Sequence, residues 1–160
     1  MDPAITGVEA VFAKFPDEPA VVALRTLATD AKFDRDELTI TVAPENIVAA
    51  LKAVQEAGYN FLEDVTAVDW YPSEPRFQIS YSILSHSLKR RLRVVARVGG
   101  SAPEIDSAVV VWPSANFYER EVFDLFGVKF KNHPNLRRIM MPEDWEGHPL
   151  RKDYPVEGYR

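Results

Sequence analysis

Residues 128–160, at the C-terminal end of the chain, combine two features that are rarely found together. They contain four prolines, a density that disfavours both a regular helix and a central strand. They are also rich in large apolar side chains, in which disordered segments are poor. These side chains are Phe130, Leu136, Ile139, Met140, Met141, Trp145, Leu150 and Tyr154. We therefore predict an extended, partner-binding tail at 128–160 and a folded body at 1–127.

The apolar residues near the N-terminus follow first a helical and then a strand period. Ile5–Phe15 carries apolar residues at three- and four-residue steps, which predicts a first helix that Pro16 ends. Val21–Leu27 is apolar and β-branched and predicts a strand. The polar stretch Asp34–Asp36 then predicts a turn, and the alternation in Leu38–Val42 predicts a second strand.

The middle of the chain predicts one more helix and three more strands. The helix begins near Pro44 and ends near Gly58, which suit a first helical position and a C-terminal cap. Apolar residues then alternate over 61–70, 77–83 and 92–98. The expected core residues are Ile47, Leu51, Val54, Phe77, Ile79, Tyr81 and Ile83.

These elements predict an α+β fold of two layers. The last three strands are joined by short connections, so they form an antiparallel meander within a mixed sheet. The order is helix, two strands, helix, three strands, and the helices must cover one face of the sheet. A further helix at about 114–126, which Gly127 ends, follows the sheet and precedes the tail.

Composition excludes several classes of function. The chain has no cysteine, which rules out a disulfide scaffold, a thiolate zinc site, a cysteine nucleophile and an all-thiolate iron–sulfur cluster. Its formal net charge is −5, which argues against a bulk electrostatic hold on nucleic acid. No run approaches the roughly 20 apolar residues of a membrane span, and no signal peptide is evident. We expect a soluble, cytosolic chain.

Two constellations could support chemistry. His133, Asp144 and His148 contain the ligand types of a metal-dependent hydrolase, but their spacing fits no ligand motif and a proline follows each histidine. Glu119 and Glu121 would point to different sides of a helix, so they cannot act jointly on one substrate atom. A structural ion pair between Arg120 and Asp124, four residues apart, is the favoured interpretation there.

A basic run lies in the last strand of the expected meander, and it could contact phosphate or an acidic partner. It lacks interleaved aromatic residues, which disfavours nucleic-acid binding. Glycine-rich phosphate loops and a nucleophile elbow are absent as well. The run consists of Lys89, Arg90, Arg91, Arg93 and Arg97. From the residues alone, the chain binds something large through its C-terminal third and catalyses nothing itself.

The stretch Glu119–Ile139 resembles the signature of the C-type subunit family of the proton-pumping NADH-quinone oxidoreductase, respiratory complex I. The stretch Pro142–Pro155, the triplet Val68–Trp70 and the strand Arg76–Leu84 resemble the same family. The residues carried over from the signature as family and partner-binding positions are Glu119, Arg120, Glu121, Asp124, Gly127, His133, Pro134, Arg137, Arg138, Trp145, His148, Arg151, Lys152, Asp153 and Tyr154.

One position departs from the family pattern, because Asn132 stands where glycine is usual before the His-Pro pair. Asparagine tolerates left-handed backbone better than other non-glycine residues, so we expect the turn to persist.

The resemblance implies a subunit without catalytic, cofactor-binding or metal-binding residues of its own. Flavin mononucleotide and iron–sulfur clusters would be held by partner subunits. The chain would pack on the D-type and B-type subunits near the quinone site, in the peripheral arm on the cytoplasmic side of the membrane. It would support electron transfer from NADH to quinone without being catalytic in isolation. Arg137, Arg138, Arg151 and Lys152 would pair with acidic residues of the D-type subunit, and Trp145 and Tyr154 would serve as apolar anchors.

Related complexes use the same subunit type, which leaves an alternative open. A membrane-bound hydrogenase, a coenzyme F420-linked dehydrogenase and a ferredoxin-fed version of the complex differ in the electron donor. The resemblance does not distinguish among these donors.

Overall fold

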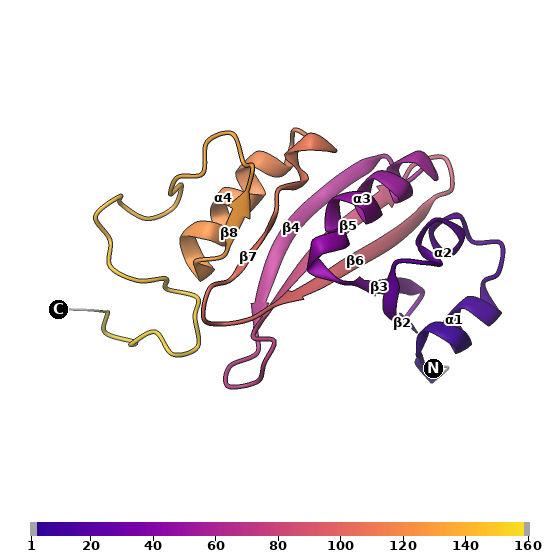
Figure 1. Ribbon diagram of the computed structural model, residues 1–160, viewed down its shortest axis with the longest axis horizontal. Coiled ribbons are helices and arrows are strands. Elements are labelled where there is room, and N and C mark those ends of the chain that lie inside the picture. Colours follow the sequence, from indigo (N-terminus) through magenta and orange to yellow (C-terminus); the bar gives the residue numbers. More distant parts are fainter. Residues whose placement is uncertain (1–2, 159–160) are drawn as a thin grey trace.

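A six-stranded mixed sheet forms the body of the protein in the computed structural model, which describes residues 3–158. Its strands lie in the order β1-β2-β3-β6-β5-β4 (Figure 1). They are β1 (Ile5–Thr6), β2 (Ala28–Asp34), β3 (Glu37–Val42), β4 (Phe61–Asp69), β5 (Phe77–Ser85) and β6 (Arg90–Val98). The helices that pack on it from the N-terminal half are α1 (Val8–Lys14), α2 (Pro19–Leu24) and α3 (Ile47–Glu56), the last preceded by the short 3-10 helix η1 (Pro44–Asn46). This architecture confirms the α+β fold predicted from the sequence.

The pairing of the strands follows from the length of their connections. β4, β5 and β6 form the predicted antiparallel meander, and β2 pairs with β3 as a hairpin whose turn residues Arg35 and Asp36 have positive φ. β3 lies parallel to β6, with Leu38 opposite Leu92, so the two halves of the sheet join at this pair. Parallel neighbours need a crossover, which α3 and the first two strands of the meander supply.

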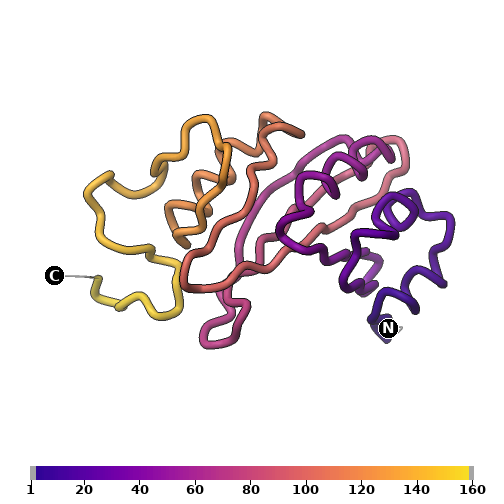
Figure 2. The backbone as a smooth tube through the Cα atoms, in the orientation of Figure 1, coloured from indigo at the N-terminus to yellow at the C-terminus, as the bar shows by residue number. Residues whose placement is uncertain are grey.

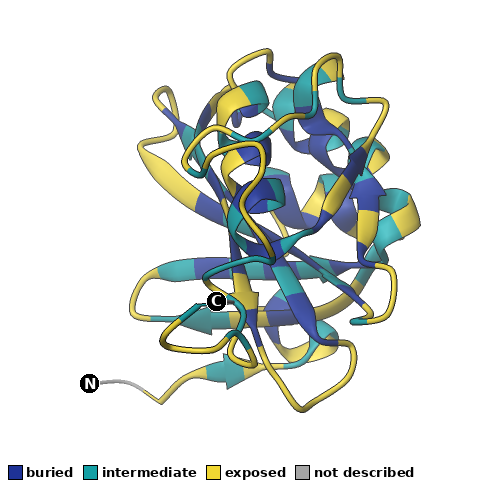
Figure 3. Cartoon of the chain, turned by 90° about the vertical axis from the view of Figure 1, so that its left-hand side faces the viewer, coloured by how far each residue is buried: buried dark blue, intermediate teal, exposed yellow. Residues whose placement is uncertain are grey.

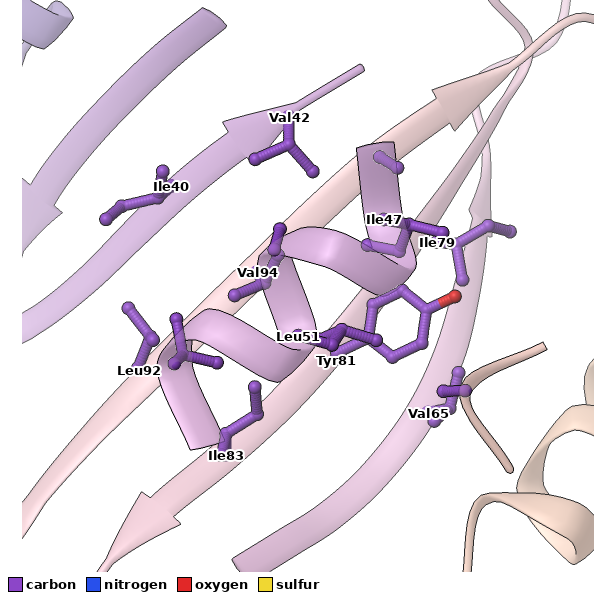
Figure 4. Close-up of a cluster of buried hydrophobic side chains, with 14 of the residues drawn as sticks. Ile40, Val42, Ile47, Leu51, Val65, Ile79, Tyr81, Ile83, Leu92 and Val94 are labelled. Atoms are coloured by element: carbon purple, nitrogen blue, oxygen red, sulfur yellow. The ribbon is translucent and has the colours of Figure 1, made fainter. Parts of the chain in front are cut away.

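The core lies between α3 and the sheet. Figure 4 shows Ile47 and Leu51 of α3 above Ile79, Tyr81 and Ile83 of β5. All seven residues predicted for the core have no solvent exposure. Alternation along a strand puts every second side chain on one face, which is why the sequence pattern found this layer correctly.

Two predictions for the N-terminal region were wrong. Ile5–Phe15 is not a single helix, because Ile5–Thr6 pairs with β2 and Gly7 (φ 95°) separates this strand from α1. Val21–Leu27 is not a strand. Pro19 occupies the first turn of α2, and the strand of this region is β2, which begins only at Ala28. Val21 and Leu24 are fully buried in the helix, so tertiary packing outweighed their β propensity.

The C-terminal part adds a helix, α4 (Ala115–Phe126), beside β4. A small parallel sheet of β7 (Glu104–Asp106) and β8 (Lys129–Lys131) and the short 3-10 helix η2 (Ala108–Val110) accompany it. Residues 128 and 130, the first apolar residues of the predicted tail, are buried in the common core. Asn132 has φ 62°, which confirms the left-handed turn expected there.

After β8 the chain has no further helix or strand within the described residues. Figure 2 shows the tail starting from the end of β8, near the upper end of α4, making a wide loop and returning past the lower end of that helix. No helix among residues 3–158 is long and apolar enough to cross a membrane.

Candidate functional site

Three ionisable side chains of α4 are buried against other parts of the chain. Glu119 and Asp124 have no solvent exposure, and Arg120 is 8% exposed. Glu121 is exposed, so it and the buried Glu119 lie on different sides of the helix, as predicted. Buried charges are costly unless they are paired and hydrogen-bonded, so the partners of these three residues show what α4 holds in place.

Asp124 binds the backbone of the tail. Its Oδ2 accepts hydrogen bonds from the N–H groups of Ile139, Met140 and Met141 at 3.0, 2.7 and 2.9 Å, and its Oδ1 accepts from Arg138 Nη1 at 3.0 Å. Burial alone would raise the pKa of Asp124. The three N–H donors and the charge of Arg138 outweigh burial and hold this pKa below its usual value. One carboxylate therefore fixes four consecutive residues of the tail.

Arg120 also turns toward the tail, so the predicted ion pair between Arg120 and Asp124 is wrong. The guanidinium donates to the carbonyl oxygens of Arg137 and Arg138, both at 3.2 Å, and lies over the ring of Phe117. The spacing of four residues suited an ion pair within the helix. Both side chains instead satisfy polar groups of a segment that contains little regular structure of its own.

Glu119 ties α4 to the segment before it. Its carboxylate accepts from Ser107 Oγ and from the Ala108 N–H group, each at 2.6 Å. Burial, opposed by these two hydrogen bonds, raises the pKa of Glu119 to about 7. His133 Nε2 lies 3.9 Å from Glu119 Oε2. Glu119 thus links α4 to η2 by hydrogen bonds and lies close to His133 in the tail.

His133 and His148 also hold the tail in place, through hydrogen bonds to backbone groups. His133 accepts from the Asn135 N–H group at Nδ1 (3.0 Å) and donates from Nε2 to the Asn116 carbonyl (3.1 Å), an arrangement that suits the neutral ring. Burial lowers the pKa of His133 and of His148. Among residues 3–158, no three His, Cys, Asp or Glu side chains are placed to hold a metal ion. The structure does not assemble His133, Asp144 and His148 into a site.

The tail caps the C-terminal end of α4. The last four carbonyls of a helix lack partners within the helix. Here the carbonyl of Phe123 accepts from Gly127, and the remaining three accept from the tail. The tail donors are His148 Nδ1 to Asp124 (2.8 Å), the Leu150 N–H group to Leu125 (3.0 Å) and Arg151 Nε to Phe126 (2.6 Å). The cationic Arg151 also suits the negative end of the helix dipole.

Gly127 is required where the tail crosses this helix end. Its φ of 74° is left-handed, which glycine adopts without strain. A Cβ at this position would lie only 2.5 Å from Arg151 Nη2 and from His148 Cδ2. Both the backbone conformation and the close approach of the tail therefore demand glycine.

A second attachment joins the tail to the sheet. Arg76 donates to Asp69 from Nε (2.9 Å) and Nη2 (2.8 Å), and to Asp153 from Nη1 (2.9 Å) and Nη2 (2.6 Å). The Lys152 N–H group donates to Asp69 as well (2.8 Å). Burial would raise the pKa of Asp69, but the hydrogen bonds from Arg76, Lys152 and Tyr71 lower it to about 2.

Polar contacts hold the tail beyond β8, and three of its large apolar side chains face solvent, although Phe130 is buried and Leu136 packs against the core. Met140 is 64% exposed, Leu150 51% and Trp145 41%. Trp145 Nε1 donates to the hydroxyl of Tyr154 at 3.1 Å, so the two predicted anchors lie together. Figure 3 looks onto this end of the molecule, where exposed loops surround buried helix residues.

The remaining predicted residues divide into two groups. Pro134, Arg137 and Lys152 are exposed, so they are accessible to a partner. Arg138 and Arg151 bind Asp124 and the Phe126 carbonyl of their own chain, and their pairing with a partner's acids stays a prediction. The side chains of the site are used to fasten the tail. The Ser107 hydroxyl does lie beside the Glu119 carboxylate, but both residues are buried, at 2% and 0% exposure, and so are closed to a substrate.

Residues 40–160 match the family model described as the 30 kDa subunit of respiratory-chain NADH dehydrogenase. The chain belongs to this family. Two curated relatives are C-type subunits of NADH-quinone oxidoreductase, from Citrifermentans bemidjiense (49% identical over 144 residues) and from Geobacter sulfurreducens (50% identical over 131 residues). These alignments cover 87% of this chain and 89% of the first relative, and 81% of both this chain and the second.

Two solved structures resemble the fold described above. A trypsin-resistant fragment of Nqo5 is 31% identical with a TM-score of 0.59, over 62% of this chain and 83% of that one. A chain of the membrane-bound sulfane sulfur reductase, an archaeal respiratory membrane complex, is 26% identical with a TM-score of 0.74, over 84% of this chain and 82% of that one. The likeness therefore extends to more than one kind of respiratory complex.

Reasoning from residue types missed the members of this site that lie in the body. Ser107, Asp69 and Arg76 were not singled out, although Asp69 and Arg76 fall within the stretches that resembled the family. An acidic residue at the end of one strand and an arginine at the start of the next are the only local signal. Asp153, their common partner, lies 77 residues beyond Arg76.

Proposed function

We propose that this chain is a peripheral-arm subunit, without cofactors of its own, of a proton-translocating NADH-quinone oxidoreductase. It packs on the D-type and B-type subunits near the quinone site, on the cytoplasmic side of the membrane. The flavin and iron–sulfur clusters that carry electrons from NADH to quinone are held by other subunits. The chain contributes shape and contact surface, and in isolation it catalyses no reaction.

One observation carries this proposal: the tail is fixed by buried polar contacts while Met140, Trp145 and Leu150 remain exposed. A segment that only completed its own domain would turn such side chains inward. Large exposed apolar groups on an ordered segment are typical of a surface that binds another protein. Since Asp124 and Arg76 already order the tail, the partner does not have to supply the ordering free energy in full.

The polar groups of the site support a structural role over a catalytic one. The carboxylates of Asp69, Glu119 and Asp124 all accept hydrogen bonds from the protein itself. A general base needs a lone pair directed at a substrate. A metal site needs several ligand atoms directed at one ion. The arrangement supports attachment of the tail.

A second candidate is the equivalent subunit of a related complex with a different electron donor. This candidate is supported by the fold, which resembles a chain of the archaeal membrane-bound sulfane sulfur reductase with a TM-score of 0.74. In that case the scaffold role of this chain is the same, and the proteins around it differ.

The test is affinity purification of a tagged copy from the membranes of the source organism. We expect D-type and B-type subunits to co-purify, together with the flavin-containing subunit that oxidises NADH. A preparation that contains hydrogenase or F420-linked subunits would favour the second candidate. A tagged chain that returns alone, or with flavin or metal bound to it, would contradict both.

A further inference from the structure

Two kinds of contact hold the tail beyond β8, and they differ in how they respond to mild acid. Asp124 and Arg76 hold the tail through carboxylates, and the lowered pKa values of Asp124 and Asp69 keep these groups ionised well below neutral pH. His133 and His148 hold it through ring nitrogens that bond to backbone groups. Histidine is the side chain whose charge ordinarily changes between pH 5 and 8, so these two contacts are the pH-sensitive ones.

The ring of His133 is bound in a form that excludes a second proton. Its side chain is 0% exposed. Nε2 donates to the Asn116 carbonyl, and Nδ1 accepts from the Asn135 N–H group at 3.0 Å. A second proton would have to sit on Nδ1, where it would face the Asn135 N–H group, and the two donors would repel each other. The charged ring therefore does not fit the attached tail.

Two ionisable groups of α4 face the His133 ring, and neither compensates for a charge on it. The Glu119 carboxyl lies 3.9 Å from Nε2. Burial raises the pKa of Glu119 to about 7, so this group is largely uncharged in the range in which a histidine binds its proton. Burial lowers the pKa of His133, the bond to Asn116 opposes this only in part, and the positive charge of Arg120 lowers the pKa further.

His148 lies beside two cations. Its Nδ1 donates to the Asp124 carbonyl at 2.8 Å, so a second proton would go to Nε2. Nε2 and Arg151 Nη2 each lie 2.5 Å from the point that a Cβ of residue 127 would occupy, so the two nitrogens are close neighbours. Arg138 also opposes a charge on the ring. Burial and these two guanidinium groups outweigh Asp124, which favours the charge, and they lower the pKa of His148.

We propose that mild acid protonates His133 and His148 and thereby releases the parts of the tail that these two rings hold, while the contacts to Asp124 and Arg76 persist. Each ring binds its second proton readily only after it has left α4, so acid favours the released state. The segment between the two persistent contacts carries Trp145, and its presentation to a partner then depends on pH. The inference concerns this chain alone and does not depend on which partner the tail binds.

Nuclear magnetic resonance of the full-length chain tests the first step, which is the protonation of the two rings. The signal of the proton on Cε1 reports the titration of each histidine separately. We expect His133 and His148 to titrate below 6.5, the ordinary value for histidine. Titration of both rings at or above this value would overturn the proposal.

Amide hydrogen exchange tests the second step, which is release. The Leu150 N–H group, bonded to the Leu125 carbonyl, reports the attachment beside His148. The Met140 N–H group, bonded to Asp124, reports a contact that should persist. Exchange rates are divided by the intrinsic rate at each pH to give protection factors. From pH 7.5 to pH 5.5 the protection of Leu150 should fall about tenfold, the factor by which proton binding to one histidine of ordinary pKa favours release. Protection of Met140 should not change.

Three matched substitutions remove one histidine each. Asparagine places its amide group where Nδ1 of the ring lies, so His148→Asn can keep the backbone bond and cannot titrate. In this variant the protection of Leu150 should be the same at both pH values, whatever its absolute size. His133→Asn should likewise remove the pH dependence of exchange at Asn135. His86→Asn, which removes an exposed histidine outside the tail, should retain the tenfold change of the wild type.

The outcomes separate the histidines from the other groups that could respond to acid. A protection of Leu150 that does not vary with pH in the wild type, or a loss that persists in His148→Asn, would overturn the proposal. Equal loss at Met140 would also overturn it, because the contact to Asp124 would then be released as well. Glu119→Gln should show the same release as the wild type, and its absence there would assign the effect to Glu119. Failure of the tail to bind its partners would leave these results unaffected.

Discussion

Arg76 joins the tail to the sheet through Asp153, whose Oδ1 accepts from Arg76 Nη2 at 2.6 Å. The same guanidinium is bound to Asp69, which has a 2% exposed side chain. The two carboxylates differ in their surroundings, since the side chain of Asp153 is 42% exposed. This difference separates the contribution of Arg76 to folding from its contribution to holding the tail.

Substitution of Arg76 and of Asp153 should therefore have unequal effects. Arg76→Ala leaves the buried Asp69 carboxylate without its cation, which should cost about 3–5 kcal/mol of unfolding free energy. Asp153→Asn removes an exposed partner and should cost at most about 1 kcal/mol. Urea unfolding of both variants measures the difference. Similar losses would show that Asp153 carries more of the fold than its exposure indicates.

Asp153→Asn should nevertheless make the tail easier to cleave. Trypsin cuts after Arg151 and Lys152, both close to this attachment. We expect cleavage there to be several-fold faster in the variant, with the body intact on a gel. Glu157→Gln, an exposed acidic-residue control in the same tail, should leave the rate unchanged. An unaltered rate in Asp153→Asn would mean that the contacts to α4 alone hold this segment.

Gly127→Ala tests the crossing of the tail over the end of α4. A Cβ at 127 would lie 2.5 Å from side-chain atoms of His148 and Arg151, so these two side chains must move. Alanine at φ 74° adds backbone strain to this cost. Gly58→Ala is the matched control, because Gly58 has φ 98° but its nearest neighbour to a Cβ is Leu88 Cδ1 at 3.9 Å. The control should lose about 1–2 kcal/mol from strain alone. Gly127→Ala should lose more and show faster proteolysis of the tail, and equal losses would contradict the close approach.

Glu119→Gln should change how stability depends on pH. Burial raises the pKa of Glu119 from 4.5 to about 7, so the folded state binds the proton more tightly than the unfolded state. The stability from this group is present below pH 4.5 and is lost as pH rises to about 7. The wild type should thus lose on the order of 3 kcal/mol relative to Glu119→Gln across this window.

Denaturant unfolding of both proteins between these pH values measures that difference. His133 and His148 act in the opposite direction, because their lowered pKa values make stability rise as pH rises. Both proteins retain these histidines, so the comparison removes their contribution to first order. A difference between the two proteins that does not vary with pH would show that Glu119 stays ionised in the folded state.

Sequence reasoning succeeded where structure is set locally and failed where it is set by distant partners. The alternation of Ile79 and Tyr81 placed β5 correctly because a strand has only two faces. Gly127 and Asn132 were correct because few residues adopt left-handed backbone. Val21 was misplaced because its propensity was outweighed by packing in α2. The partners of Asp124 lie 14 to 17 residues away, in a segment whose apolar residues follow no helix or strand period. No local sequence pattern therefore predicts these contacts.

Trp145→Ala should weaken assembly with the D-type and B-type subunits far more than Lys129→Ala, a substitution at an exposed position in β8. Trp145 presents a partly exposed aromatic face on a tail that Asp124 and Arg76 already hold, and buried aromatic anchors contribute about 2 kcal/mol or more to an interface. Substitution is a cleaner test than truncation after Phe126, which would also remove buried Val128 and the caps of α4. Co-expression with both subunits, followed by size-exclusion chromatography, measures the yield of complex. Leu150→Ala, which keeps the backbone bond of residue 150 to Leu125, should act in the same direction as Trp145→Ala. Normal yields for both would place the partner on another surface of the chain.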